Sequence, residues 1–225
     1  MTTPSLIPPA PITTTPDMTL PTHRLHTDTD DGMLLIISGP SGVGKTTITR
    51  GVERGIPDAV FSVSATTRPR TSADVDGVDY HFVTDDEFLA MRARDEFLET
   101  ADIYGKRYGT PRAWVEEQLR RGRLVILEID VEGARQVKAK VPQAFGIFVM
   151  PPTESALLER LRARKREDES AIQRRFAEAK REIESAQTCG VYDRFLINEK
   201  IDDAIHEAQG IVAGERERRR RSRPR

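Results

Sequence analysis

The feature that most constrains the fold of this chain is a glycine-rich loop between an apolar run and a helical pattern. The apolar run MLLIIS occupies residues 33–38, the loop GPSGVGKT occupies residues 39–46, and a helix-like segment begins KTTITRGV. The loop matches the spacing G-x-x-x-x-G-K-[ST] in the strand-to-helix context that this motif requires. Glycines let backbone N–H groups approach an anion closely, so the loop predicts a site for the phosphates of a nucleoside triphosphate.

The residues of this loop have separable expected roles. The lysine, Lys45, supplies a positive charge for the β- and γ-phosphates, and the positive end of the following helix points at the same phosphates. The hydroxyl of Thr46 is placed to ligate Mg²⁺. We assign nine consecutive residues to the phosphate donor: Gly39, Pro40, Ser41, Gly42, Val43, Gly44, Lys45, Thr46 and Thr47. The loop alone leaves hydrolysis, phosphoryl transfer and switching open.

Short apolar runs alternate with helical patterns along the rest of the chain. The runs MLLIIS, LVILEI, FGIFVM and RFLIN are rich enough in β-forming residues to be buried strands. Strands that alternate with helices favour a parallel sheet with right-handed crossovers. Residues 61–65, FSVSA, alternate apolar and polar side chains and predict one more strand with a polar face. The sequence therefore indicates the α/β class.

Three helical segments are marked by their ends or by their composition. Thr84 is followed three residues later by Glu87, which is a capping box. A second helix is expected to have Thr110 as its cap and Pro111 in its first turn, and to end at Gly122. The arginine-rich stretch 153–186 predicts two helices with a break near KREDES.

Composition limits the remaining classes of protein. The chain has 225 residues, a formal net charge of -1 and one cysteine, Cys189, so an internal disulfide is impossible and a cytoplasmic location is expected. No apolar run approaches the roughly 18 residues of a membrane span. Residues 1–31 are rich in Thr and Pro and are expected to be a disordered arm. Residues 214–225 form a basic tail, for which we expect solvation or a frayed helix end; we expect no specific binding to nucleic acid.

Several motifs that follow the loop occur in an order and at spacings that identify a family. They are FSVSATTR, DGVDYHF, FLETADIYGKRYGT, LEIDVEGA and FLIN. Together with the loop they resemble guanylate kinase, a P-loop nucleoside monophosphate kinase, over nearly everything from Met33 to about Val212. The resemblance implies a three-layer P-loop fold with a five-stranded parallel sheet in a domain of residues 32–213. It also implies a small mixed-β GMP-binding region at about 65–112 and a helical lid at about 153–186.

The resemblance implies transfer of the γ-phosphate of ATP to GMP with Mg²⁺, giving ADP and GDP in purine nucleotide metabolism. The GMP-binding positions it implies are Ser64, Arg68, Arg70, Tyr80, Glu99, Tyr108, Thr110 and Asp130. A carboxylate such as that of Glu99 suits guanine because it accepts from two adjacent donors, N1–H and N2–H₂, whereas N1 of adenine would repel it. Among the remaining positions, Asn198 would contact the donor adenine, and the catalytic lid arginines would be Arg160, Arg164 and Arg175.

Three features depart from the family's pattern. The two arginines of the phosphate loop usually have two residues between them, whereas Arg70 follows Arg68 by two positions, so Arg70 sits one position early. We expect Arg70 still to reach the phosphate of GMP. The lid has Ala163 and Lys165 where glycines are usual, and Glu128 stands where Asp is often found.

Each of these site residues also has an ordinary structural interpretation, and the chain could have another function. A glutamate on a helix, taken alone, is usually a surface residue, and the tyrosines and loop arginines could be ordinary surface groups. The nearest rival function is a kinase for another phosphorylated small molecule on the same scaffold. Another is a non-catalytic guanylate-kinase-like binding module, but such modules tend to lose the glycine loop and its lysine, and Lys45 is present. A switch GTPase would need N-K-x-D, which the chain lacks.

Overall fold

The computed structural model describes residues 32–103, 105–163 and 168–222. The arm expected at residues 1–31, the lid residues Arg164 and Lys165, and residues 223–225 lie outside the described part of the chain. Within it, no helix is both long and apolar enough to cross a lipid bilayer.

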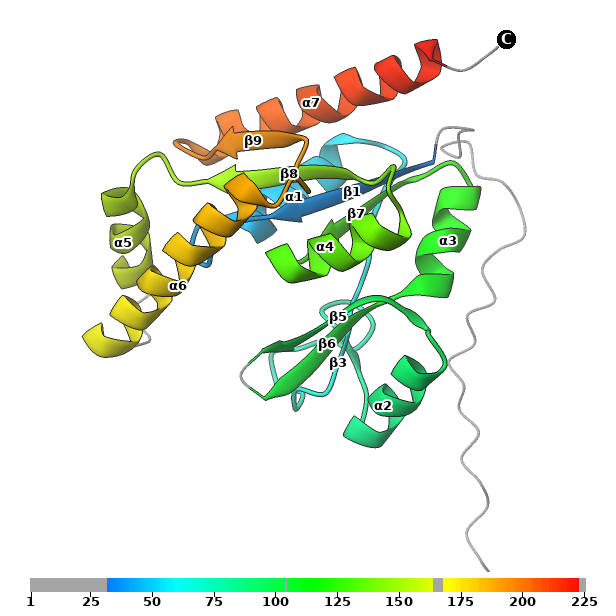
Figure 1. Ribbon diagram of the computed structural model, residues 1–225, viewed down its shortest axis with the longest axis horizontal. Coiled ribbons are helices and arrows are strands. Elements are labelled where there is room, and N and C mark those ends of the chain that lie inside the picture. The colour runs from blue at the N-terminus through cyan, green and yellow to red at the C-terminus, as the bar shows by residue number, and fades with distance from the viewer. Residues whose placement is uncertain (1–31, 104, 164–167, 223–225) are drawn as a thin grey trace, which may run out of the picture.

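A five-stranded parallel sheet forms the centre of the larger part of the molecule (Figure 1). Its strands, in spatial order, are β2 (Ala59–Phe61), β7 (Leu124–Glu128), β1 (Met33–Ser38), β8 (Phe145–Met150) and β9 (Arg194–Ile197). Neighbouring strands pair in parallel throughout. The strands expected from the four apolar runs are all present, and the five-stranded parallel sheet is confirmed.

Helices cover both faces of this sheet because both faces of each central strand are apolar. Along β1, Leu35 and Ile37 enter one core, whereas Leu34 and Ile36 enter the other. The first core is closed by α1 (Lys45–Gly55) and α7 (Ile201–Arg221), which pack against each other. The second core is closed by α3 (Arg112–Arg120), α4 (Val131–Lys140) and the end of α6 (Glu169–Thr188). The near-continuous apolar sequence of β1 is what this three-layer arrangement requires.

A smaller mixed sheet lies below the parallel sheet in Figure 1. Its strands, in spatial order, are β4 (His81–Phe82), β3 (Ala65–Thr66), β6 (Lys106–Pro111) and β5 (Phe97–Ile103). Helix α2 (Asp85–Ala93) covers it through Phe88, whose ring stacks on Phe97 with 4.6 Å between centroids.

The single strand expected over residues 61–65 is wrong. Strand β2 ends at Phe61 in the parallel sheet, and β3 begins at Ala65 in the small sheet. The backbone N–H of Ser62 still donates to Ile126 of the parallel sheet, whereas the carbonyl of Ser64 accepts from His81 of the small sheet. The alternating side chains therefore mark a crossing between two sheets, each of which pairs with part of the segment.

The predicted helix ends are partly correct. Thr84 and Glu87 form the expected capping box, with both backbone N–H groups satisfied by the opposite side chain. Thr110 is not a helix cap, because α3 begins after Pro111 and Thr110 belongs to β6. Its hydroxyl donates instead to Glu99, so a partner on the neighbouring strand overrides the local capping preference.

The arginine-rich stretch forms two helices, α5 (Glu154–Ala163) and α6, packed through Leu157, Leu161, Ile172 and Ala179. The basic segment expected as a tail from Gly214 continues α7 as far as Arg221. Within that segment Glu215 is buried, and Arg216 pairs with Asp58 next to β2.

Candidate active site

The carboxyl end of the parallel sheet brings the chemically interesting segments together. The glycine loop follows β1, Asp130 follows β7, and Asn198 follows β9. Because parallel strands end at the same edge, these segments converge in the crevice where open α/β sheets bind ligands.

The glycine loop has a backbone that side chains would disturb. Gly44 has φ +96°, and a Cβ there would lie 2.7 Å from Nδ2 of Asn198. The same Nδ2 donates to the carbonyl of Val43 over 2.8 Å, so Asn198 braces the loop from the end of β9. Asn198 is 3% exposed, which makes the brace an interior contact. The structure thus gives Asn198 a contact with the glycine loop through Nδ2, and its expected contact with the donor adenine stays a prediction.

The lysine of the loop folds over the loop itself. The ammonium of Lys45 donates to the carbonyl of Gly39 and, over 3.2 Å, to the carbonyl of Pro40. Lys45 is the first residue of α1, so its charge and the positive end of the helix lie at the same place. This arrangement suits an anion with several phosphate groups.

An oxygen pair beside the loop fits a magnesium ion. The hydroxyl of Thr46 donates to Oε1 of Glu128 over 2.8 Å, and Thr46 is exposed. Hydroxyl and carboxylate oxygens are ligands that Mg²⁺ accepts, usually with only one or two protein groups and with phosphates completing the octahedron. No cluster of three or more His, Cys, Asp or Glu that could hold a metal occurs in the described ranges.

Two of the three expected lid arginines reach the sheet edge. Arg175 on α6 donates to the hydroxyl of Ser41 in the glycine loop. Arg160 on α5 donates through Nη2 to the carbonyls of Asn198 (2.8 Å) and Glu199 (3.2 Å). Its Nη1 is buried and has no acceptor among the described residues. The third arginine, Arg164, lies outside the described residues.

Glu99 occupies a buried position on strand β5, which differs from the exposed helical position that its type alone suggests. It is 4% exposed, and Oε1 accepts a 2.6 Å hydrogen bond from the Thr110 hydroxyl. A Cβ on Gly133 would lie 2.9 Å from Oε2 of Glu99 and 3.3 Å from Oδ1 of Asp130, so Glu99 meets the start of α4 there. Burial raises the pKa of Glu99 to about 7, the Thr110 hydrogen bond opposes that rise, and the charge of Asp130 adds to it.

Asp130 serves the fold as well as the site. It is the N-cap of α4, and its Oδ1 accepts from the backbone N–H of Gly133 over 2.7 Å. Asp130 therefore stabilises the start of α4, and the same carboxylate also faces Glu99.

Arg68, Tyr80 and Tyr108 gather at the small sheet. The guanidinium carbon of Arg68 lies 5.2 Å from the centroid of the Tyr80 ring. The rings of Tyr80 and Tyr108 meet edge to face, 5.7 Å apart. Ser64 is half-buried immediately before β3, the strand that pairs with the strand of Tyr108. A cation and two phenols can together hold a phosphate dianion.

Arg70 does not join this group in the structure. Its side chain is exposed, and its Nε donates to the backbone carbonyl of Asp74 over 3.0 Å. The arginine that sits one position early thus points along its own turn, and the expectation that it reaches the phosphate now depends on a rearrangement of that turn.

Three acids that the structure places at the site were given no role from the sequence, although Glu128 was noted as a departure from the family's pattern. Glu128 meets Thr46, and Asp74 holds Arg68 in an ion pair of 2.8 Å. Glu182 on α6 is half-buried, and burial raises its pKa to about 7, while the charge of Lys45 opposes that rise. For Glu128, its position at a strand end was a signal. For Glu182, the signal was its place seven residues after Arg175, on the same face of a helix.

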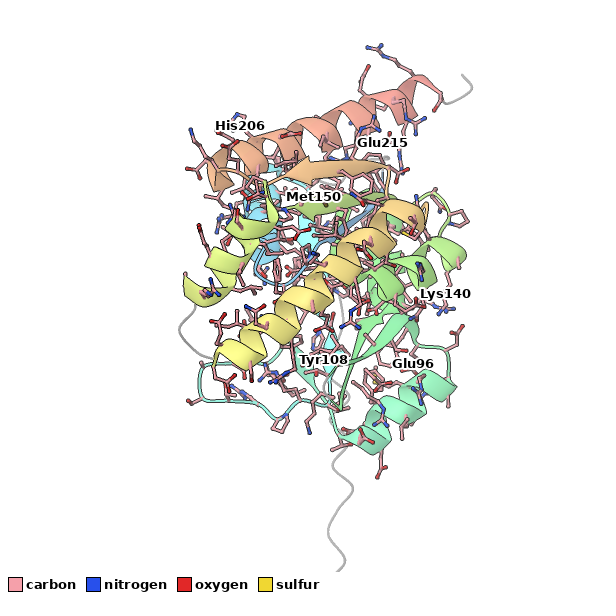
Figure 2. The ribbon with its side chains drawn as sticks, turned by 60° about the vertical axis from the view of Figure 1, so that its left-hand side comes forward. Glu96, Tyr108, Lys140, Met150, His206 and Glu215 are labelled. Carbon is pink, nitrogen blue, oxygen red and sulfur yellow. The ribbon has the colours of Figure 1, made fainter. Side chains whose placement is uncertain are left out.

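Helix α6 lies across the site. In Figure 2 this helix passes between Met150, at the end of β8, and Tyr108, in the small sheet. It is fixed to the loop by Arg175 and to α4 by Arg135, whose Nη2 donates to the Ser185 hydroxyl over 3.1 Å. The helix is therefore attached both to the donor loop and to α4.

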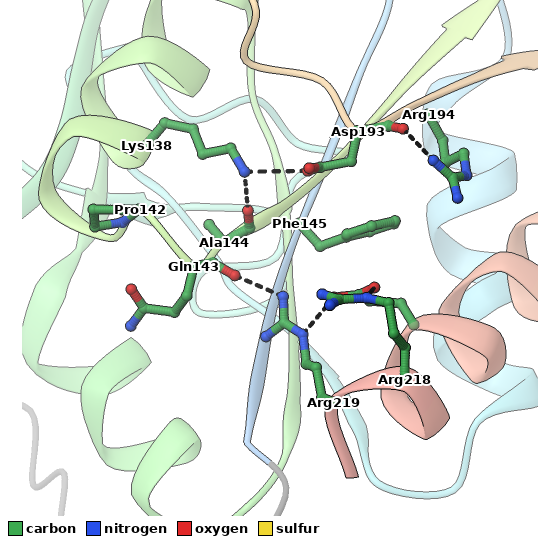
Figure 3. A pocket seen from close by; sticks show the side chains of 10 residues that line it. Lys138, Pro142, Gln143, Ala144, Phe145, Asp193, Arg194, Arg218 and Arg219 are labelled. Carbon is green, nitrogen blue, oxygen red and sulfur yellow. Dashed lines mark hydrogen bonds and ion pairs between the residues drawn. The ribbon is translucent and has the colours of Figure 1, made fainter. Parts of the chain in front are cut away.

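A pocket of about 480 Å³ lies at the opposite, amino end of β8 and β9 (Figure 3). Its basic groups are paired within the protein: Lys138 with Asp193, and Arg218 and Arg219 with Glu215. Arg219 also donates to the carbonyl of Gln143. None of the residues expected at the active site lines it, and these contacts fasten the end of α7 to the turn before β8.

A sequence model described as guanylate kinase matches residues 31–215. The chain belongs to the guanylate kinase family. Guanylate kinase from Anaeromyxobacter dehalogenans is 45% identical over 186 residues, covering 82% of this chain and 81% of that protein. Guanylate kinase from Carboxydothermus hydrogenoformans is 43% identical, covering 82% of this chain and 89% of that protein.

A solved structure agrees with the sequence comparisons. The crystal structure of guanylate kinase from Anaplasma phagocytophilum is 30% identical, covers 83% of this chain and 87% of its own, and superposes with a TM-score of 0.66. The predicted family and P-loop kinase fold are confirmed. As a guanylate kinase the chain is a nucleoside monophosphate kinase, an ATP:GMP phosphotransferase.

Proposed function

We propose that this guanylate kinase moves the γ-phosphate of ATP to GMP in the cytoplasm, with Mg²⁺ at the donor phosphates and the two substrates held at separate groups of residues. The observation that carries this division is the buried pair of Glu99 and Thr110, 2.6 Å apart, beside Asp130 at the edge of the sheet that carries the glycine loop. A guanine-selective group and a phosphate-binding loop thus share one crevice.

The donor side is built from the glycine loop and the residues around it. The backbone N–H groups of residues 39 and 41–47 surround the ATP phosphates, Pro40 having none, Lys45 neutralises the β- and γ-phosphates, and Asn198 keeps the loop in shape. Thr46 and Glu128 would hold Mg²⁺, which when bound offsets the negative charge that develops on the donor phosphates.

The acceptor side holds GMP by both ends. The Glu99 carboxylate accepts from N1–H and N2–H₂ of guanine, and Thr110 and Ser64 add hydroxyl groups toward the base. Arg68, Tyr80 and Tyr108 receive the phosphate. Leaving buried polar groups unpaired penalises the wrong base, by about 10⁴-fold where a site is built for hydrogen bonding.

No covalent intermediate with the protein is needed. The attacking phosphate oxygen of GMP and the γ-phosphorus of ATP are brought into line, and cationic side chains stabilise the charge that spreads over the transferred group. Arg160 and Arg175 approach from α5 and α6, so they complete the site only when the helical lid is in place. Such closure keeps water from taking the phosphate.

Two substitutions separate the roles of the two sides. Lys45→Ala is expected to lower turnover by at least about 10³-fold and to leave the dissociation constant of GMP within about twofold, because the lysine meets only the donor phosphates. Glu99→Ala is expected to weaken GMP binding by about 10²-fold, because a base edge loses its acceptor. Steady-state kinetics and calorimetric GMP titration measure both quantities. If the two variants lost GMP affinity equally, the separation of donor and acceptor groups would be wrong.

A further inference from the structure

The turn between β3 and β4 contains a carboxylate to which the family resemblance assigned no role. Both oxygens of Asp74 accept from Arg68: Oδ1 from Nη2 over 2.8 Å and Oδ2 from Nη1 over 3.0 Å. Oδ2 also accepts from the backbone N–H of Thr71 over 2.7 Å and from its hydroxyl over 2.6 Å. Four hydrogen bonds therefore fix the orientation of the Asp74 carboxylate.

Two aromatic rings also contact the Arg68 guanidinium. Its carbon lies 5.2 Å from the ring centroid of Tyr80 and 5.4 Å from that of Phe82. The side chain of Arg68 is 27% exposed and that of Asp74 is 14% exposed, so the pair is half-buried against the small sheet. The pair with Asp74 is end-on, which uses one N–H of each terminal nitrogen and leaves the Nε side of the fork for a second oxyanion.

The charges of this pair are constant through the neutral range. The hydrogen bonds from Arg68 and Thr71 hold the pKa of Asp74 well below its usual range. The hydrogen bond to Asp74 raises the pKa of Arg68. Asp74 thus remains an anion next to Arg68 whenever the enzyme works, and it acts by geometry and not by titration.

The same turn directs the neighbouring arginine elsewhere. Arg70 is exposed, and its Nε donates to the backbone carbonyl of Asp74. The turn centred on Asp74 therefore holds one arginine against Tyr80 and keeps the other along its outer side.

We propose that Asp74 is a positioning residue for the phosphate of GMP: it fixes the Arg68 guanidinium beside Tyr80 and Tyr108, so that Arg68, and not Arg70, supplies the arginine contact to that phosphate. This inference rests on the proposed function of the same site. Arg70, which is shifted by one position, then stays at the surface. Arg68, already oriented by Asp74, is then the single arginine that binds the phosphate.

The test compares a ligand that has the phosphate with one that lacks it. Asp74→Asn keeps the shape of the side chain but removes its charge, and should weaken GMP binding about tenfold, which is the effect of one charge-assisted hydrogen bond. Binding of guanosine should stay within about twofold of wild type, because the base-binding residues are untouched. The KM for GMP should rise while kcat changes by less than about threefold.

Further variants complete this test. Arg68→Ala should weaken GMP binding by more than Asp74→Asn does, whereas Arg70→Ala should stay within about twofold of wild type. Asp74→Glu, which retains the charge, should recover part of the loss. Asp86→Asn in α2 is the matched control, an exposed acid of the same region, and should bind both ligands like wild type. If Asp74→Asn fails to fold, Thr71→Val removes only the hydroxyl that holds Asp74, and should weaken GMP but not guanosine by about threefold.

Several results would overturn the proposal. They are unchanged or tighter GMP binding by Asp74→Asn, an equal loss for guanosine and GMP, or a loss in Arg70→Ala as large as that in Arg68→Ala. These outcomes leave the proposed function standing as long as the wild-type enzyme phosphorylates GMP. A wild-type enzyme without that activity would instead refute the proposed function.

Discussion

At the scale of single residues, the most consequential group is a carboxyl buried where a carboxylate is required. Glu99 is 4% exposed, and burial raises its pKa to about 7, with Asp130 adding to the shift. Its neighbours Thr110 and Lys140 favour the ionised form and limit the rise. Guanine needs two acceptors on this side chain, so only the ionised form is competent to bind.

The affinity for GMP should consequently depend on pH. Below pH 7 the free enzyme must lose a proton from Glu99 before it binds, so the dissociation constant should rise as the pH falls and level off above about pH 8. From pH 8 to pH 6 the contribution of Glu99 is about tenfold, and the second ionisation of the GMP phosphate adds about twofold in the same direction. Calorimetric titrations in buffers of matched ionic strength measure the dissociation constant of GMP at each pH.

Glu99→Gln is the control for this pH dependence, since its amide does not titrate. The variant should bind GMP weakly at every pH and retain only the twofold change that belongs to the phosphate of GMP. A wild-type dissociation constant that stays flat between pH 6 and pH 8 would show that Glu99 is already ionised in the free enzyme, and would contradict the burial argument.

The sequence predicted the local structure of the glycine loop because the strand, the loop and the helix are contiguous, whereas the donor roles of its residues stay predictions. A strand, a glycine loop and a helix are contiguous, so the positions of Gly44, Lys45 and Thr46 follow from the motif alone. Arg70 and Thr110 were harder to place, since their partners are a carbonyl in a turn and a buried glutamate on another strand. Such partners cannot be derived from local spacing.

At the scale of elements, the glycine loop depends on a strand that is distant in sequence. Asn198, at the end of β9, donates to Val43 and fills the space next to Gly44. The residue resembles a base contact in sequence, yet its amide nitrogen is committed to the loop. Strand β9 is therefore part of the support of the phosphate site.

Removing this support should affect the donor selectively. Asn198→Ala leaves the carbonyl of Val43 without that donor in the interior, at a cost of about 1–3 kcal/mol in the free energy of unfolding. We expect the KM for ATP to rise by about five- to twentyfold, because a loosened loop is less well pre-organised to bind ATP. The dissociation constant of GMP should stay unchanged. Glu199→Ala, an exposed neighbour, is the matched control.

Steady-state kinetics with ATP, a calorimetric titration with GMP and a thermal melt test this prediction. Loss of stability without any change in the KM for ATP would make Asn198 a purely structural residue. A parallel loss of GMP affinity would show that β9 supports the whole crevice and not the loop alone.

Elements that are regular over many residues were predictable, and short ones were not. The runs that became β1, β7, β8 and β9 are apolar on both faces, as buried parallel strands must be. The strand expected over residues 61–65 fails because β3 is two residues long and pairs with residues 16 positions later in β4 and 42 to 44 positions later in β6. Pairing at that distance leaves no period in the local sequence.

At the scale of the whole molecule, function depends on two sheets that meet through a few contacts. Gln136 on α4 exchanges two 3.0 Å hydrogen bonds with the backbone of Thr100 on β5, and this contact joins the parallel sheet's helices to the GMP-binding sheet. The division into a phosphate donor region and an acceptor region is thus a property of the fold.

The proposed function requires one crevice that holds a nucleoside triphosphate at the glycine loop and a guanine monophosphate at Glu99. The most direct measurement is ADP release from ATP and Mg²⁺ across a panel of nucleoside monophosphates: GMP, AMP, CMP, UMP and dTMP. We expect rapid conversion of GMP to GDP, and rates at least about 10³-fold lower for AMP and the pyrimidines. Comparable rates for AMP or dTMP, or no turnover of GMP, would contradict it.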